Sequence, residues 1–188
     1  MTEATQVSEG MLLLATPLLL DPNFVESVVL MLDVNDEGAL GVVLNRPTGL
    51  AVAEVLAGWA DVVAEPEVLF QGGPVETDGA LAVAMLSSSI EDNVGFRGVA
   101  GQLGLLDLDT PVELVTGSLD GLRIFAGYAG WGAGQLQAEI DEGHWYVVPG
   151  RAEDVFRSDA SDLWRDVLRR QPGDLAMHST RPVDPDLN

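Results

Sequence analysis

Residues 27–44 read SVVLMLDVNDEGALGVVL, with two apolar runs on either side of a short polar segment. The first run is rich in valine and leucine, which favour strands, and the second, from Ala39 to Leu44, is equally apolar. Between them lies Asn35-Asp36-Glu37-Gly38, typical turn residues whose glycine can take a positive φ. The stretch therefore predicts a β-hairpin that turns at Gly38.

Similar short apolar runs, each bounded by turn-forming residues, predict further strands on both sides of the hairpin. Apolar residues at helical spacing predict amphipathic helices, one over 50–60 and one near the C-terminus. The C-terminal helix is expected to be capped by Ser158 or Asp159 and to end at Arg169-Arg170. The predicted strands are residues 11–15, 68–71, 80–86, 103–108, 122–128 and 145–148, and a further helix is predicted over 135–140.

Strands and helices interleave irregularly, and the first paired strands form a hairpin. This pattern predicts the α+β class: a single compact domain with a mixed, mostly antiparallel sheet, flanked by helices that include the C-terminal amphipathic one. We expect residues 1–9 to be a disordered leader, residues 10–170 to form the domain, and residues 171–188 to be a tail. Residues 87–102, with several serines and glycines, are expected to form a mobile loop.

The charge balance excludes several classes of function. The 188 residues contain 9 basic side chains, all of them arginine, against 30 acidic ones, a net charge of −21, and there is no cysteine. A chain without cysteine or lysine has no thiolate nucleophile, Schiff-base lysine or Walker A loop. Its charge argues against direct binding to nucleic acid. The apolar run from Met11 to Leu20 is far shorter than the ~20 residues of a membrane span, and no basic leader precedes it, so we expect a cytoplasmic protein and no membrane partner.

No catalytic motif is recognisable. The two histidines, His144 and His178, belong to no HExxH motif, and no Gly-x-Ser-x-Gly elbow occurs. We therefore predict no metal ligands and no cofactor, and the catalytic residues, if there are any, stay unknown. The glycine-dense stretch 127–134 has two interpretations: a tight turn packed against the sheet, or a loop whose backbone amides hold a small ligand ahead of a helix.

Four blocks of this sequence, in order, resemble the AlgH/YqgE family of bacterial proteins of unknown function. The resemblance spans residues 10 to about 170 and implies a compact α+β fold. The family takes its name from a proposed regulatory role in alginate production and has no established enzymatic activity. The blocks are LLLATP (12–17) with DPNF (21–24), GALGVVLNRP (38–47), GGPV (72–75), and GYAGW (127–131) with GQL (134–136) and Trp145.

The shared blocks are mostly turn-forming residues at strand ends, where binding sites are often built. We hypothesise that they converge on one pocket in which Arg46 and the amides of 130–134 face an anionic or polar ligand. The alternative is that Asn45 and Arg46 tie loops together, for example through an Arg46–Asp21 pair. The candidate ligand-binding residues are Asp21, Asn45, Arg46, Gly72, Gly73, Tyr128, Trp131 and Gln135.

Two classes of function follow from these observations. The favoured interpretation is a non-enzymatic binding protein, or an indirect regulator of transcription, that recognises a small polar or anionic ligand or a protein partner. The alternative is a hydrolase or transferase that uses carboxylates and a divalent cation.

Overall fold

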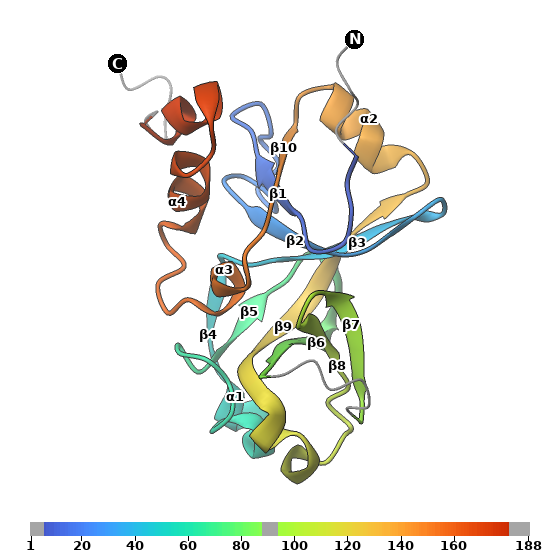
Figure 1. The fold of residues 1–188 in the computed structure, drawn as a ribbon, viewed down its shortest axis with the longest axis vertical. Coiled ribbons are helices and arrows are strands. Elements are labelled where there is room, and N and C mark those ends of the chain that lie inside the picture. Colours follow the sequence, from blue (N-terminus) through green and yellow to red (C-terminus); the bar gives the residue numbers. More distant parts are fainter. Residues whose placement is uncertain (1–5, 88–93, 181–188) are drawn as a thin grey trace.

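A computed structural model describes residues 6–87 and 94–180 of the chain (Figure 1). Its fold confirms the predicted α+β class, with ten strands in a curled sheet and short helices packed around it. No helix of the described residues is long and apolar enough to span a membrane. The strands are β1 (Leu12–Ala15), β2 (Val28–Asn35), β3 (Gly38–Val43), β4 (Pro47–Ala51), β5 (Val68–Gln71), β6 (Val75–Leu86), β7 (Phe96–Ala100), β8 (Leu103–Leu106), β9 (Leu119–Gly132) and β10 (Trp145–Val148). The α-helices are α1 (Val52–Val55), α2 (Gln135–Asp141), α3 (Ala152–Phe156) and α4 (Leu163–Arg169).

The predicted hairpin is confirmed as β2 and β3, which pair antiparallel from Val29 opposite Val43 to Asn35 opposite Gly38. Gly38 has a φ of +149°. A Cβ atom there would lie 2.2 Å from the carbonyl oxygen of Trp131 in β9, so this turn requires glycine both for its backbone and for its contact with the next strand.

The sheet is mixed and mostly antiparallel, as predicted, in the order β10-β1-β2-β3-β9-β6-β8-β7. Strand β5 pairs with β4 antiparallel and with β9 parallel. The 14-residue β9 pairs with β3 through one part of its length and with β6 and β5 through another, and so joins the two halves of the molecule (Figure 1).

The core lies on both faces of the strands. In β1, Leu12 and Leu14 belong to one apolar cluster and Leu13 and Ala15 to another, because side chains alternate between the faces of a strand. Helix α4 packs on the first cluster and α2 on the second. Each fully buried leucine contributes ~1.5–3 kcal/mol relative to exposure.

Several predicted elements differ from the structure. Over 50–60, strand β4 continues to Ala51, and the helical part is only α1 followed by a 3-10 turn at Ala57–Trp59. The break falls at Leu56, whose φ of −139° is not helical. Helix α4 begins after Asp162 rather than after Ser158 or Asp159, and the short α3 was not predicted.

Two stretches predicted as irregular are strands. Residues 96–100 of the predicted mobile loop form β7, paired with β8, while residues 88–93 lie outside the described part of the chain. Most of the glycine-dense stretch continues β9 to Gly132, where its small residues pair with β3. Pairing across strands overrides the local turn preference of glycine here.

The proposed leader and tail contact the domain where the structure describes them. The backbone N–H of Val34 donates to Glu9 Oε1 at 3.1 Å, so the chain ahead of β1 is bonded to the hairpin. At the other end, Gly173–Thr180 form a 3-10 segment against α4. The boundaries at residues 9 and 171 stay predictions.

Candidate functional site

Asn45 and Arg46 follow β3 and hold the loop that precedes β2. The side-chain amide of Asn45 accepts from the N–H of Val28 at 3.0 Å and donates to the carbonyl of Glu26 at 2.9 Å. The guanidinium of the half-buried Arg46 donates hydrogen bonds to three backbone carbonyls, those of Pro22 (3.1 Å), Asn23 and Val25 (3.0 Å). The donors of Arg46 are therefore used within the fold rather than turned to a ligand.

Asp21 acts in the same loop. Its Oδ1 accepts from the N–H of Asn23 at 2.8 Å, and it lies close enough to affect Arg46 electrostatically. Burial lowers the pKa of Arg46, and the Asp21 carboxylate partly offsets that shift. The arrangement supports the alternative in which these residues tie loops together, although the tie runs through carbonyls of the loop more than through an ion pair.

Gly72 and Gly73 lie where β5 passes β9. A Cβ on Gly72 would lie 2.3 Å from the carbonyl oxygen of Gly127, and a Cβ on Gly73 would lie 2.2 Å from the carbonyl of Tyr128. Both contacts are with backbone, which cannot move aside. These two glycines permit a close approach of chain segments, and the structure gives them a packing role.

Trp131 and Gln135 converge on Glu139 of α2, a residue that the sequence analysis did not single out. The indole N–H groups of Trp131 and Trp145 both donate to Glu139 Oε2, at 2.8 and 2.9 Å, and Gln135 Nε2 donates to Oε1 at 3.2 Å. Phe24 packs against both indoles, with ring centroids 6.3 and 5.7 Å away. The rings contact one another, so this cluster is filled with its own side chains.

Tyr128 differs from the other predicted residues, because it lines a cavity with a volume of about 300 Å³. Six strands contribute to this cavity, which we call the Tyr128 cavity. Its apolar lining includes Leu40 of β3, Leu81 of β6 and Leu105 of β8, all half-buried. Its charged lining consists of Asp33, Glu76 and Arg97.

A backbone irregularity shapes the wall of the Tyr128 cavity. In the β6–β9 pair, Val75 lies opposite Tyr128 but Ala80 lies opposite Ala126, so four residues of β6 bulge against Gly127 alone. Within the bulge, Glu76 has a φ of +47°, which is unfavourable for a residue with a Cβ. Bulges and strained residues occur preferentially beside functional sites. The signal that the sequence offers for this bulge is Asp78-Gly79, a turn-forming pair within it.

The Tyr128 cavity continues along the hairpin. Asp33 and Leu40 also line a shallower depression of about 190 Å³, which includes Glu37 and Gly38 at the hairpin turn. The cavity and the depression share Asp33 and Leu40, and their lining at the hairpin is acidic because it includes Asp33 and Glu37.

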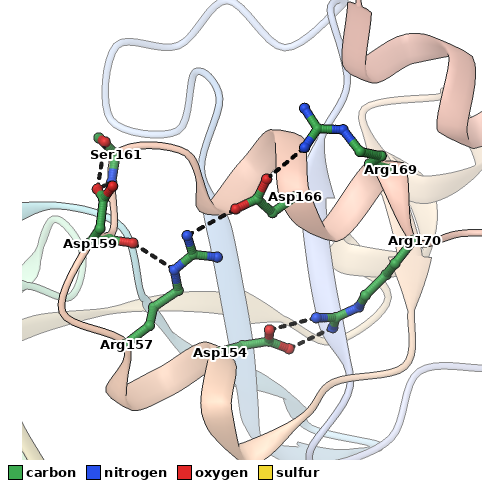
Figure 2. Close-up of polar contacts among 7 residues, drawn as sticks. All are labelled: Asp154, Arg157, Asp159, Ser161, Asp166, Arg169 and Arg170. Carbon is green, nitrogen blue, oxygen red and sulfur yellow. Dashed lines mark hydrogen bonds and ion pairs between the residues drawn. The ribbon is translucent and has the colours of Figure 1, made fainter.

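Charged side chains of the C-terminal helices pair with one another. Figure 2 shows Arg170 donating to both oxygens of Asp154 at 2.6 Å, while Asp166 binds Arg157 at 2.9 Å and Arg169 at 3.1 Å. Asp159 instead accepts hydrogen bonds from the hydroxyl and the N–H of Ser161. These bonds lower the pKa of Asp159, and the positive charge of the nearby Arg157 lowers it further. Within the described chain, no group of three or more His, Cys, Asp or Glu residues is arranged to hold a metal ion. These carboxylates are explained by ion pairs and turns.

Comparison with known proteins gives a consistent result. A family model described as AlgH-like (DUF179) matches residues 12–176. The chain is 54% identical over 191 residues to a UPF0301 protein of Streptomyces avermitilis, covering 100% of this chain and 98% of that protein. It is 45% identical over 183 residues to a UPF0301 protein of Mycobacterium tuberculosis, with 96% and 91% covered.

Two solved structures share the fold. A crystal structure of a protein from Corynebacterium diphtheriae is similar with a TM-score of 0.89 at 32% identity, covering 95% of each chain. The solution structure of the AlgH protein from Pseudomonas aeruginosa is similar with a TM-score of 0.67 at 27% identity, covering 97% of this chain and 98% of that one.

Proposed function

This chain belongs to the AlgH-like family of uncharacterised proteins, and on that premise we propose that it is a non-enzymatic binding protein whose ligand occupies the Tyr128 cavity. The observation that carries the proposal is a cavity whose lining combines apolar side chains with charged groups of both signs. Small-molecule sites are typically concave and mostly apolar, with a few polar groups that orient the ligand.

Three features of the described residues favour this cavity over the Arg46 loop. The donors of Arg46 are engaged by loop carbonyls, whereas the exposed guanidinium of Arg97 has no hydrogen bond or ion pair among residues 6–87 and 94–180. The cavity lies where six strands meet, so its walls are held by the sheet. Its wall also contains the strained Glu76.

Enzymatic action is the less favoured alternative. A hydrolase or transferase would require a general acid, a general base or a metal in the cavity, with an orienting partner for the reactive group. Asp33 and Glu76 line the cavity, but among residues 6–87 and 94–180 no hydrogen bond joins their carboxylates to each other or to a histidine. Binding is the simpler account of the same groups.

The proposal is tested by a thermal-shift screen of metabolites on the wild type, on Arg97→Ala and on Arg151→Ala. Arg151 is the matched control, because it is also an exposed arginine but does not line the cavity. A ligand at 100 times its Kd adds about 2.7 kcal/mol to the free energy of unfolding, which raises Tm by about 5–10 °C for a chain of this size.

We expect compounds that stabilise the wild type and Arg151→Ala but stabilise Arg97→Ala much less. The proposal is wrong if every stabilising compound acts equally on all three proteins, or if a broad screen of polar and amphipathic metabolites yields none.

A further inference from the structure

We infer, building on the proposed function, that the Tyr128 cavity selects a zwitterionic compound: one anionic group and one cationic group on a compact apolar body, as in an amino acid with a large apolar side chain. The inference rests on how charges of both signs are placed around one cavity without being paired to each other.

Arg97 provides the anion-binding end. It lies on β7, at the edge of the sheet, and is the one arginine among the described residues that line the cavity. Among the described residues, neither Asp33 nor Glu76 lies within ion-pair distance of it, although both line the same cavity. Guanidinium groups bind carboxylates through two parallel hydrogen bonds, so a ligand carboxylate is the chemical partner that fits Arg97.

The carboxylates provide the cation-binding end. Asp33 is half-buried and Glu76 is exposed, and Glu37 adds a further negative charge in the adjoining depression. The whole chain carries a net charge of −21. A ligand with only an anionic group would have to approach against this field, whereas a ligand with an ammonium group is attracted to it.

The size of the cavity limits the body between the two charges. A volume of about 300 Å³ corresponds to ~10 water molecules, since each water occupies ~30 Å³ in the liquid. A compound of about ten to fifteen non-hydrogen atoms would fill it. Leu40, Leu81, Leu105 and the ring of Tyr128 offer an apolar surface to its body.

Three probes that share one phenyl body separate the charge requirements: L-phenylalanine, 3-phenylpropanoate, which lacks the ammonium, and 2-phenylethylamine, which lacks the carboxylate. Calorimetric titration of the full chain should give an affinity for L-phenylalanine at least tenfold higher than for either single-charge probe. Arg97→Ala should reduce the affinity for L-phenylalanine to about that for the amine. Asp33→Asn should also weaken it, and Arg151→Ala should leave it unchanged.

The inference is overturned if either single-charge probe binds as tightly as L-phenylalanine, or if none of the three binds. In the first case, loss of binding in Arg97→Ala would still place a ligand in the cavity, so the proposed function would stand without the zwitterion requirement. In the second case, the proposed function fails as well only if the broader thermal-shift screen also finds no compound that depends on Arg97.

Discussion

Arg170 and Asp154 are joined by two hydrogen bonds of 2.6 Å between the guanidinium and both carboxylate oxygens. Asp154 is only 4% exposed, and it also accepts from the N–H of Arg151 at the start of α3. The pair thus fixes α3 to the end of α4 (Figure 2). The hydrogen bonds to Asp154 raise the pKa of Arg170, despite its partial burial.

Removing the cation from this pair should be costly. Arg170→Ala leaves the Asp154 carboxylate buried without its counter-ion, and we expect the free energy of unfolding to fall by about 3 kcal/mol. The matched control is Arg169→Ala, whose side chain is 67% exposed and pairs with Asp166 at the surface, so its loss should stay below about 1 kcal/mol. Urea denaturation of both variants measures the difference, and equal losses would contradict the assigned role.

Arg123 of β9 ties three segments of chain through its buried guanidinium. It donates to the carbonyls of Glu65, Val155 and Arg157, and lies 4.2 Å from the centre of the Phe70 ring. Arg123→Met should lower the free energy of unfolding by about 3 kcal/mol, because charge-assisted bonds contribute about 1.5–3 kcal/mol and three backbone carbonyls, that of Val155 fully buried, lose their donor.

The pH dependence of that loss follows from the pKa of Arg123, which burial lowers to about 10. The folded state gives up this proton more readily than the unfolded state, so the cost of burying the charge is fully present below pH 10 and declines only above it. The difference between wild type and Arg123→Met should therefore be constant from pH 6 to pH 9. A difference that changes steadily within this range would contradict the assignment.

Glu139 should matter mainly as an acceptor for two indoles. Glu139→Gln keeps one oxygen that can accept both N–H groups and should cost about 1 kcal/mol, whereas Glu139→Leu leaves two buried donors unpaired and should cost about 2–5 kcal/mol. Chemical denaturation followed by tryptophan fluorescence measures both losses. Equal losses in the two variants would show that the indole bonds contribute little.

Glu76 should affect binding more than stability. Glu76→Gly relieves the positive φ but increases the freedom of the unfolded chain, and these effects offset each other to within about 1 kcal/mol. We expect Tm to change by no more than a few degrees while the Tm shift caused by a cavity ligand becomes smaller. An unchanged ligand shift would argue against a role for this carboxylate.

Arg46 should show the opposite behaviour. Arg46→Ala releases the loop 22–25 and should lower the free energy of unfolding by about 1–2 kcal/mol, yet a ligand of the Tyr128 cavity should still raise Tm as much as in the wild type. If Arg46→Ala abolishes the ligand shift instead, the binding site lies at the loop that the sequence blocks first suggested.

The fold could be predicted from the sequence further than the site could. The hairpin at Gly38 was predictable because apolar runs and turn residues act locally, and so were β1, β5 and β10. The continuation of β9 beyond Tyr128, through residues 129–132, was not, since it depends on pairing with β3, which lies about 90 residues earlier in the chain. The predicted helix over 50–60 was too long for the same reason, because its first residues belong to β4 and pair with β5.

Most of the residues that are conspicuous in the sequence blocks lie outside the Tyr128 cavity. Asn45, Arg46, Gly72 and Gly73 stand out in the sequence, and the structure uses them for loop ties and close backbone contacts. Arg97, Asp33 and Glu76 sit in unremarkable segments, and only the curl of the sheet brings them to one cavity with Tyr128. The chemical nature of each residue alone does not predict that these four side chains lie around one cavity.

The most direct test of the central claim is a map of backbone amide chemical shifts during titration with the strongest stabilising compound of the screen. A ligand in the Tyr128 cavity should move the amides of Asp33, Leu40, Arg97, Leu105 and residues 76–81 and 127–128 most. Shifts concentrated at residues 22–25 and Arg46, or at residues 131–139, would contradict the claim.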